Sequence, residues 1–398
     1  MPGAAHPTRD DIDFVSGEFW GRPPDAELTW LRANAPVYWD GQVWGVARYD
    51  DLKAVSKDPA TFSNAGGIRP DSGPIPMMID MDDPQHVQRR KLVNKGFTPR
   101  RVRDSEAQIR SVCDSIIDKV CEQGECDFVW DIAAPLPLIM IGDALGVEPE
   151  DRDELLEWSD GMLKALTGDP STIEAATAAF VGYVEYAGRV IEDRKANPRD
   201  DLMSVLVHAE VDGDRLDHDS LVHESLLILI GGDETTRHVI SGGGWQLLHA
   251  RDQWDRLVAD RSGLGVAVEE MLRWVSPIKN MARTVTRDVE LRGQQLHEGE
   301  KLLLLYSSAN RDEDVFTDPF TFDSTRAPNE HVAFGFGSHF CLGNSLARLE
   351  LQVMFDQLLT RLPDLHLVDE AEPTYRAANF ISGYEQMPVR FTPTAPRG

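Results

Sequence analysis

The residues best suited to do chemistry lie in one run near the C-terminal end of the chain, 334–343 (FGFGSHFCLG). Cys341 stands just before a predicted helix, where free backbone N–H groups and the helix dipole stabilise a thiolate. Gly343 lets the backbone come close to whatever the sulfur binds. His339, two residues before the cysteine, could act as the base of a cysteine nucleophile. A buried structural cysteine is the alternative, and these residues alone leave both interpretations open.

A second run, 226–236 (LLILIGGDETT), places two glycines inside an apolar helical pattern. Glycine costs about 1 kcal/mol relative to alanine in a helix, and close helix packing is the usual reason for its presence. Here an acid and two threonines follow at once. The Thr235 hydroxyl can bond the carbonyl of Gly231, one turn back, and loosen the helix there. Such an opening would make room for O2 above a flat cofactor.

Glu270 and Arg273 stand three residues apart, so their side chains can meet on one face of a helix. Such pairs are common on exposed helices, but the residues around this one are apolar, which predicts that it is buried. A buried ion pair requires a further partner to satisfy its charges. The pair is therefore predicted to be structural.

The elements that must position these residues are mainly helical. Apolar residues recur with helical spacing in three segments, 109–120, 265–275 and 344–362. Strand-like segments are short: 37–46, 289–296, 301–306 and 389–391. No repeat, linker or change of composition divides the chain. We therefore predict one domain over residues 1–398, with loose tails at about 1–10 and 393–398.

The composition excludes several classes of protein. With 398 residues, of which 41% are hydrophobic and 27% charged, the chain can bury a core and is too apolar for wholesale disorder. Its longest apolar runs are about five residues, against the ~20 of a membrane span, and its first residues lack the apolar region of a secretory signal. We predict a cytoplasmic protein with no transmembrane segment. A net charge of −27 should also repel nucleic acid.

In combination, these motifs resemble the cytochrome P450 family. The run at 334–343 meets every fixed position of that family's signature, Phe-Gly-x-Gly-x-His-x-Cys-x-Gly. The resemblance implies a mainly α fold, a multihelical triangular prism with small β-sheets at its margin. It also implies a haem b cofactor between a distal and a proximal helix. Cys341 would be the ligand of the haem iron, and an anionic sulfur ligand favours O–O cleavage.

The same resemblance implies further contacts to the haem. Phe334 would pack against the haem and the sulfur, and Gly335 and Gly343 would shape the loop around that sulfur. The two haem propionates require cationic partners. Four positions match those that bind propionates in the family: His86, Arg90, Arg283 and His339.

On the distal side, the resemblance makes Thr235 the residue that positions O2 and water, and Glu234 the residue that relays protons from solvent. A haem-thiolate sensor would need no such proton relay. The resemblance also supplies Arg326 as the third partner of the Glu270–Arg273 pair.

One basic segment interrupts the negative charge. Residues 89–103 (RRKLVNKGFTPRRVR) hold seven basic residues and no acid. A solvated helix face is the ordinary explanation of such a run. In the P450 fold, however, this segment borders the proximal face, where the electron donor docks. We therefore predict that an acidic ferredoxin binds near four of these residues: Arg89, Lys91, Lys95 and Arg100.

Longer strings resemble one bacterial branch of the family, the steroid 26/27-monooxygenases of cholesterol-degrading actinobacteria. Among them are 64–70 (NAGGIRP), 76–84 (PMMIDMDDP) and 89–98 (RRKLVNKGFT). The resemblance implies that the terminal methyl (C26/C27) of the cholesterol or cholest-4-en-3-one side chain is hydroxylated and then oxidised to the acid. A narrow apolar funnel must then point that methyl at the iron. The residues predicted to line it are Met77, Met78, Ile228, Gly232, Thr235, Met281 and Phe380.

Three other functions remain open at this point. The first is a P450 that hydroxylates a fatty acid or a terpenoid. The second is a haem-thiolate sensor or sterol-binding protein without turnover. The third is a hydrolase that uses Cys341 as its nucleophile.

Overall fold

The computed structural model describes residues 8–164, 172–370 and 372–398, and most of them lie in helices. The helices are α1 (Gly17–Trp20), α2 (Asp25–Asn34), α3 (Tyr49–Ser56), α4 (Gln85–Val93), α5 (Pro99–Asp104), α6 (Glu106–Val120), α7 (Pro135–Leu145), α8 (Arg152–Lys164), α9 (Ile173–Ala196), α10 (Leu202–His208), α11 (His218–His249), α12 (Arg251–Ala259), α13 (Leu264–Val275), α14 (Tyr306–Ala309) and α15 (Asn344–Arg361). The three predicted helices are confirmed as α6, α13 and α15.

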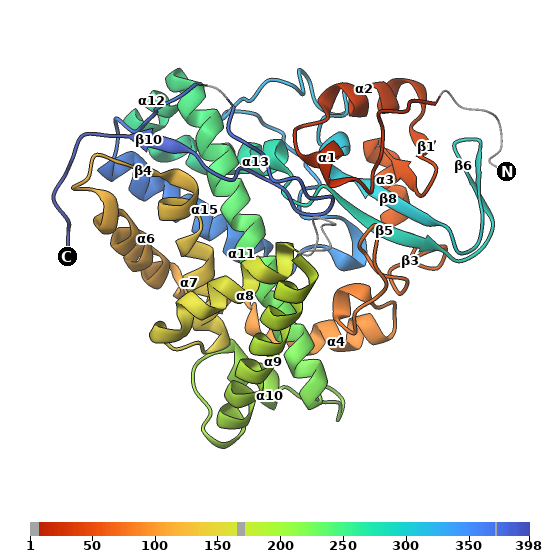
Figure 1. Ribbon diagram of the computed structural model, residues 1–398, viewed down its shortest axis with the longest axis horizontal. Helices are drawn as coiled ribbons and strands as arrows, with labels where there is room; N and C mark the ends of the chain where they lie inside the picture. The colour runs from red at the N-terminus through yellow and green to blue at the C-terminus, as the bar shows by residue number, and fades with distance from the viewer. Residues whose placement is uncertain (1–7, 165–171, 371) are drawn as a thin grey trace.

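The strands form three small sheets. They are β1 (Val37–Trp39), β2 (Trp44–Val46), β3 (Phe62–Ser63), β4 (Glu125–Asp127), β5 (Asn280–Val285), β6 (Val289–Leu291), β7 (Gln294–Leu296), β8 (Lys301–Leu305), β9 (His366–Leu367) and β10 (Pro388–Arg390). The strand orders are β1-β2-β8-β5-β3, β4-β10-β9 and β6-β7. The largest sheet lies at one side of a roughly triangular outline and the β6-β7 hairpin projects from it (Figure 1). The predicted mainly helical architecture with marginal sheets is confirmed.

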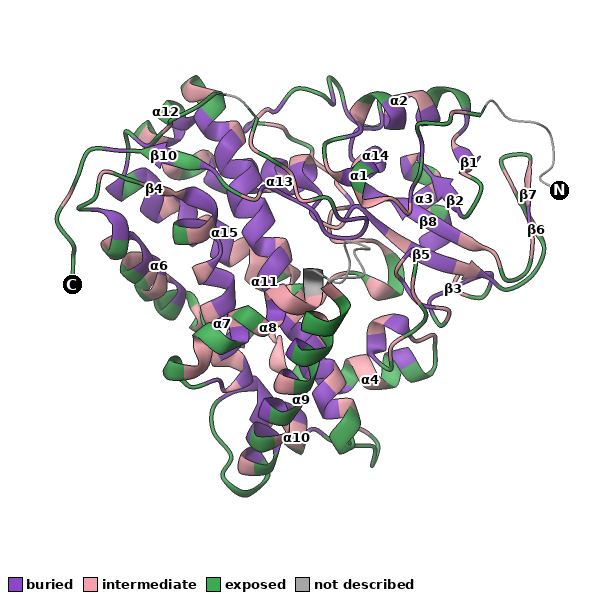
Figure 2. Ribbon diagram, in the orientation of Figure 1, coloured by how far each residue is buried: buried purple, intermediate pink, exposed green. Residues whose placement is uncertain are grey.

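The long helix α11 forms the centre of the fold. It begins at Asp217, whose carboxylate accepts a hydrogen bond from the backbone N–H of Ser220 (2.7 Å). Most of its 32 residues are buried, and Figure 2 shows it buried along most of its length, whereas α6 and α9 have an exposed outer face. A helix that is apolar all round belongs in a core. It packs against α7, α9, α13 and α15, so its middle is held rigidly.

Two predicted strands are hairpins in the structure. In the segment 37–46, Asp40 accepts hydrogen bonds from the N–H groups of Gln42 and Val43, and Gly41 has φ +105°. In the segment 289–296, Arg292 (φ 49°) and Gly293 (φ 77°) form a two-residue turn between β6 and β7. Positive φ at these positions reverses the chain, so each segment pairs with itself.

The end segments pack on the rest of the molecule. The amide of Asn379 donates to the carbonyl of Val15 (2.7 Å), which joins the two ends of the chain. Much of the predicted N-terminal tail lies outside the described residues. In the predicted C-terminal tail, the N–H groups of Arg397 and Gly398 donate to Asp118 (3.0 and 3.2 Å).

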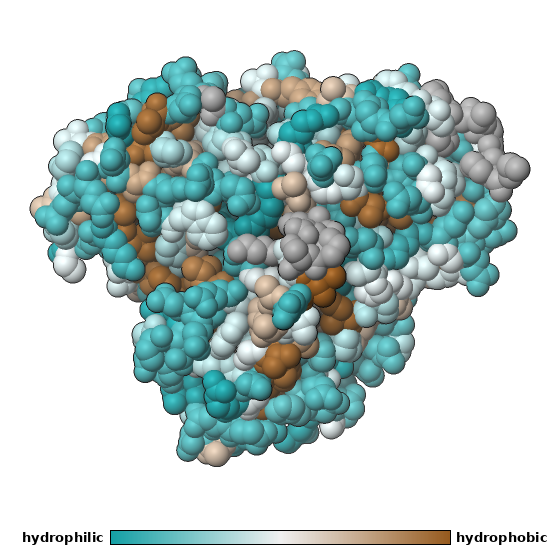
Figure 3. All heavy atoms as spheres, in the orientation of Figure 1, coloured by the Kyte–Doolittle hydropathy of each residue, from teal (hydrophilic) through white to brown (hydrophobic). Residues whose placement is uncertain are grey.

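One stretch, Phe128–Leu145, is long and apolar enough to cross a membrane by length and composition. Two thirds of it (67%) is buried inside the protein, because it belongs to the two largest apolar clusters. This is the burial of a core helix. The face shown in Figure 3 is mostly hydrophilic, with apolar side chains gathered in separate small patches.

Candidate active site

The cysteine segment forms a tight loop in front of α15. The N–H of Cys341 donates to the carbonyl of Phe334 (2.9 Å), and Asn344 donates its amide Nδ2 to the carbonyl of Cys341 (2.7 Å). Gly337 has φ +79°, and a Cβ there would lie 2.5 Å from the carbonyl oxygen of Ser56. A larger residue would displace the loop, which therefore depends on glycine to hold the sulfur in place.

The surroundings of Cys341 suit a metal ligand. Burial raises the pKa of its thiol, while N–H groups of Gly343 and Asn344 and the charges of Arg90 and Arg348 favour the thiolate. A bound metal ion deprotonates a coordinating thiol outright. Within the described residues, no three His, Cys, Asp or Glu side chains are grouped to hold a metal ion. A metal at Cys341 would therefore take its other ligands from a non-protein group.

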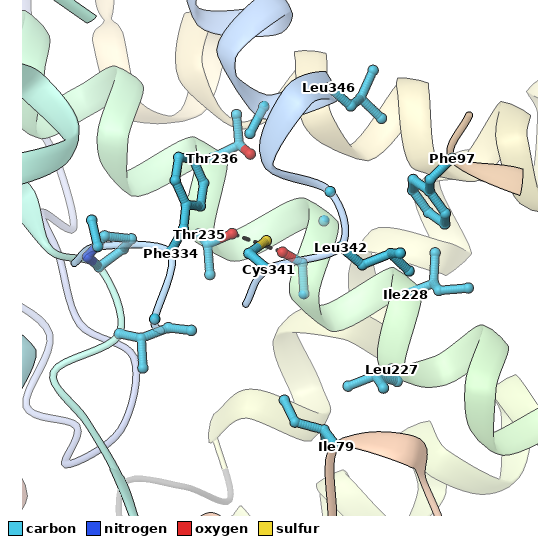
Figure 4. A pocket seen from close by; sticks show the side chains of 18 of the residues that line it. Ile79, Phe97, Leu227, Ile228, Thr235, Thr236, Phe334, Cys341, Leu342 and Leu346 are labelled. Carbon is cyan, nitrogen blue, oxygen red and sulfur yellow. Dashed lines mark hydrogen bonds between the residues drawn. The ribbon is translucent and has the colours of Figure 1, made fainter. Parts of the chain in front are cut away.

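Cys341 faces the middle of α11 across a cavity (Figure 4). The cavity encloses about 1370 Å³ not filled by protein atoms, part of it open to solvent. Gly231, Gly232 and Thr235 line its distal wall, and Phe334 and Cys341 line the proximal one. The space between these walls can take a flat cofactor together with a substrate.

The four predicted propionate partners include two arginines that lack a paired acid among the described residues, whereas His86 lies 3.3 Å from Asp83. The rings of His86 and His339 stack with centroids 3.9 Å apart, and both line the cavity with Arg90. Arg283 is buried, and burial lowers the pKa of its guanidinium. Arg90 donates to the carbonyl of Phe340. In the part of the chain that the structure describes, neither arginine has a carboxylate within ion-pair distance. The positive charges of Arg90 and Arg283 would be stabilised by a bound anion. These residues and Cys341 therefore fit a haem with its propionates.

The distal helix has the geometry that its sequence predicted. The hydroxyl of Thr235 donates to the carbonyl of Gly231 (2.7 Å), and Thr235 lines the cavity on the wall opposite Cys341. Because its proton is committed to that carbonyl, the hydroxyl presents its lone pairs to the cavity. It can therefore accept a hydrogen bond from a water or from another protonated oxygen.

Glu234 is buried beside Thr235 and points into a cluster of cations. It pairs with Arg237, with His238 Nε2 (3.2 Å) and with Arg376 Nη1 (3.2 Å). Burial opposes its ionisation, but the charges of Arg237 and Arg376 and the hydrogen bond with His238 outweigh burial and lower the pKa of Glu234 to about 2. Burial lowers the pKa of His238 itself to about 4. Glu234 does not line the cavity. A proton relay through it would require the carboxylate to turn away from this cluster.

Arg376 connects that cluster to the surface. It contacts Asp160 (3.4 Å) and Glu385 (2.6 Å), whose side chains are 18% and 36% exposed. The sequence analysis did not single out Arg376, because it lies 142 residues from Glu234 and no periodicity links them. The only available signal was an arginine within an otherwise uncharged segment, 373–384.

Two more buried acids close to the cavity were missed. Asp233 accepts a hydrogen bond from Ser159 of α8 (3.0 Å), and burial and the charge of Glu234 raise its pKa. Glu350 of α15 lines the cavity, and burial and the charge of Asp233 raise its pKa to about 8. An acid within the apolar face of α15 was the signal that could have identified Glu350.

The predicted structural pair is buried and has a third partner. Arg273 binds Glu270 through Nε and Nη2 (both 2.7 Å), and Arg326 Nε lies 3.1 Å from the same carboxylate. Arg273 also donates to the carbonyls of Asn310 and Pro319 (2.8 and 2.9 Å). These bonds tie α13 to the segment that leads into the cysteine loop.

Most of the predicted substrate contacts lie on the cavity. The lining residues among them are Met78, Ile228, Gly232, Thr235 and Met281. The structure differs from the prediction at two residues. Met77 is buried in the apolar cluster of α7, α9 and α11, and Phe380 packs behind the wall against Met281 and Ile79.

The basic segment runs over α4 and α5. Lys91 and Arg100 are exposed, and Arg100 lies 3.5 Å from Asp104. Lys95 donates to the carbonyl of Glu210 (2.6 Å). Arg89 is turned inward, with Nη1 3.3 Å from the buried carboxylate of Glu224. The segment is therefore partly committed to contacts within the molecule.

Comparison with known proteins agrees with this site. Residues 263–373 match the profile of the family described as Cytochrome P450. The chain is 55% identical over 393 residues to a steroid C26-monooxygenase of Mycolicibacterium smegmatis, covering 98% of each. It is 37% identical to a methyl-branched lipid omega-hydroxylase of Mycobacterium bovis, covering 96% of this chain and 95% of the other. A Mycobacterium marinum cytochrome P450 in complex with pseudoionone superposes with a TM-score of 0.89 at 34% identity, covering 98% and 100%.

The chain thus belongs to the cytochrome P450 family. It is a P450 monooxygenase, and the family and fold imply a haem with a thiolate ligand. Cys341 is the cysteine of the family signature and the only cysteine on the cavity among the described residues.

Proposed function

We propose that this enzyme hydroxylates the terminal methyl (C26/C27) of the cholesterol or cholest-4-en-3-one side chain and oxidises it further to the acid. One observation carries the proposal: the distal cavity is apolar along one side and ends at Thr235 opposite Cys341. Ile79, Leu227 and Ile228 lie along that side in Figure 4. An apolar passage of this kind suits a hydrocarbon tail. The similarity to a steroid C26-monooxygenase supports a sterol side chain as this hydrocarbon tail.

The haem, when bound through Cys341, supplies the site where O2 is activated and a C–H bond is hydroxylated. The protein's residues supply the rest. The apolar lining excludes water and orients the tail so that its terminal methyl, rather than a weaker C–H bond, reaches the reactive centre. The Thr235 hydroxyl holds a water or protonated oxygen by accepting its hydrogen bond. Glu234 moves protons when it turns from Arg376 towards the cavity.

Reduction of the haem-loaded protein under carbon monoxide, followed by titration of the ferric form with cholest-4-en-3-one, tests ligand and substrate together. We expect the Soret band typical of a thiolate ligand and a saturable shift from low to high spin. The same band without a spin shift would overturn the sterol proposal. Its absence from haem-loaded protein would overturn the assignment of Cys341.

A second substrate class has its own support. The 37% identity to a methyl-branched lipid omega-hydroxylase favours a branched fatty chain, whose terminal methyl is the same chemical group. A direct competition decides between them. Equal amounts of cholest-4-en-3-one and a methyl-branched fatty acid are offered, and the ratio of products reports the ratio of kcat/KM values. We expect the steroid product to dominate.

Electrons come, in this proposal, from an acidic ferredoxin that docks over Arg89, Lys91, Lys95 and Arg100. Lys91 and Arg100 are exposed and their side chains make no contact to another segment that the structure gives, so they should contribute to long-range attraction. Charge reversal at both residues should slow reduction by ferredoxin at low salt and flatten its dependence on salt. Lys195→Glu, an exposed lysine on α9 outside the basic segment, is the matched control. Unchanged rates in the double variant would refute the docking site.

We also propose that the enzyme works in the cytoplasm, which its acidic and mostly hydrophilic surface supports. Fractionation of the source cells tests this, and recovery in the membrane fraction after a high-salt wash would contradict it.

A further inference from the structure

A second cavity lies outside the haem site. It forms where the C-terminal half of α11 and the end of α13 meet the loop before α2 and the segment 372–384. It encloses about 1580 Å³ not filled by protein atoms, part of it open to solvent, and shares no lining residue with the haem cavity. The P450 reaction described above makes no use of it.

The inner end of this cavity holds two buried cations. Lys279 Nζ donates to the carbonyls of Val275 and Ser276 (both 3.2 Å), and Arg311 Nη2 donates to the carbonyl of Trp274 (2.9 Å). These carbonyls end α13, so both side chains cap that helix. Capping satisfies part of their donors but does not neutralise two adjacent charges.

No carboxylate among the described residues lies within ion-pair distance of Lys279 or Arg311. Burial and the nearby charge of Arg311 lower the pKa of Lys279 to about 7. Two acids line the same cavity: Asp25, whose charge acts on both Lys279 and Arg311 without forming an ion pair, and the exposed Glu372, which accepts from the Tyr384 hydroxyl (3.3 Å). A buried pair of like charges without a counter-ion in contact is costly unless an anion joins it.

Three buried donor atoms on residues that line the cavity have no hydrogen-bond partner in the part of the chain that the structure describes: Arg311 Nε, Ser307 Oγ and Trp245 Nε1. Arg311 and Ser307 belong to one stretch of chain at α14, and Trp245 belongs to α11. Unpaired buried atoms also occur elsewhere among the described residues, so these three add to the evidence of the two cations and do not replace it. A buried donor left unpaired costs about 1–3 kcal/mol, so an acceptor that reached one of them would be favoured.

The walls of the cavity are aromatic. The Trp274 ring lies 4.1 Å from the guanidinium of Arg311, and the Tyr375 ring lies 5.2 Å from the ammonium of Lys279. The Tyr375 and Tyr384 rings meet edge to face (5.0 Å). Flat aromatic walls next to fixed cations match a ligand with an apolar, planar body and one anionic end.

We propose that this second cavity binds an organic carboxylate with a flat apolar body, its carboxylate on Lys279 and Arg311 and its body between the aromatic rings. The site is independent of the haem cavity and of the proposed steroid substrate. Its occupant would bridge α11, α13 and the C-terminal segment, which otherwise meet around open space.

Calorimetric titration of 2-naphthoate into the haem-loaded enzyme tests the proposal. The distal cavity is first filled with an azole that ligates the haem iron, so that only the second cavity stays free. We expect one saturable site, and binding of the neutral 2-naphthalenemethanol at least about tenfold weaker, because it lacks the charge. No saturable heat, or equal affinity for the two compounds, would overturn the proposal.

Variants locate the site. Lys279→Met should weaken 2-naphthoate at least about tenfold and Lys279→Arg should restore most of it. Lys301→Met is the matched control, because Lys301 also donates to two carbonyls, those of Arg69 and Ser72, but lies outside the cavity. Ser307→Ala removes one buried hydroxyl from a half-buried residue, and it provides a second test if Lys279→Met does not fold. Wild-type affinity in Lys279→Met, or in Ser307→Ala where only that variant folds, would refute the site.

Discussion

Replacement of Glu234 by glutamine removes the one negative charge that Arg237, His238 and Arg376 share. The charges of Arg237 and Arg376 and the hydrogen bond with His238 lower the pKa of Glu234 from 4.5 to about 2. This shift corresponds to about 3 kcal/mol of folding free energy at about 1.4 kcal/mol per pKa unit. Loss of one partner of a buried ion pair gives a similar figure, about 3–5 kcal/mol. Easier ionisation of Asp233, whose pKa Glu234 raises, offsets a part. We therefore expect Glu234→Gln to lose about 2–3 kcal/mol at pH 7.

Urea unfolding of haem-loaded wild type and variant, followed by circular dichroism, measures the difference. A lowered carboxyl pKa stabilises the fold above the unfolded value of 4.5, and this stability is lost as pH falls towards 2. The difference between the proteins should therefore be largest near pH 6 and should shrink below pH 4.5. It should be somewhat smaller at pH 8, where Asp233, whose pKa is raised to about 7 in wild type, ionises more easily in the variant. Arg376→Met in both backgrounds gives the coupling energy between the two residues. A difference below about 1 kcal/mol at pH 7 would refute the charge balance assigned to this cluster.

Three further predictions concern single residues. Burial raises the pKa of Glu224 to about 7. As pH rises from 4.5 to 7, wild type should therefore lose about 3 kcal/mol of unfolding free energy relative to Glu224→Gln. The same free-energy difference between the two proteins at both pH values, measured by urea unfolding, would contradict this. A Cβ on Gly383 would lie 2.1 Å from His238 Nδ1, so Gly383→Ala should lower the melting temperature by several degrees, and an unchanged Tm would show that the ring can move. Thr235→Ala should lower the product formed per electron consumed. Thr177→Ala, which removes the same type of backbone contact at an exposed position of α9, should leave this ratio unchanged. The same ratio in wild type and Thr235→Ala would exclude a role for the Thr235 hydroxyl.

The parts of the site that the sequence predicted are those set by local geometry. The cysteine loop depends on glycines, a hydrogen bond between Phe334 and Cys341 and the start of α15, all within a dozen residues. The Thr235 contact to Gly231 needs only one helical turn. Such features are readable because the spacing of residue types determines them.

What could not be predicted depends on tertiary packing. Arg376 reaches Glu234 only because the C-terminal segment folds back along α11. Phe380 is absent from the cavity lining because it packs with Ile68 and Ile381 in a separate apolar cluster. The hairpin around Gly41 was misjudged for a different reason: two short strands and their turn gave one continuous strand-like pattern, although glycine and aspartate indicated the reversal.

The second cavity also had no sequence signal. Its lining residues come from segments spread between Arg22 and Tyr384, and each one taken alone is an ordinary helix cap or aromatic core residue. Only their placement around one space brings together two cations without an ion-paired carboxylate and three donor atoms without a hydrogen-bond partner among the described residues.

The central claim is tested most directly by one turnover experiment under ¹⁸O2. The haem-loaded enzyme receives cholest-4-en-3-one and electrons from a ferredoxin system, and the product is analysed by mass spectrometry. We predict that the first product carries one ¹⁸O atom on a terminal methyl carbon of the side chain. Hydroxylation at an inner carbon, or a product without ¹⁸O, would contradict the assignment of this cavity to terminal oxidation of the steroid tail.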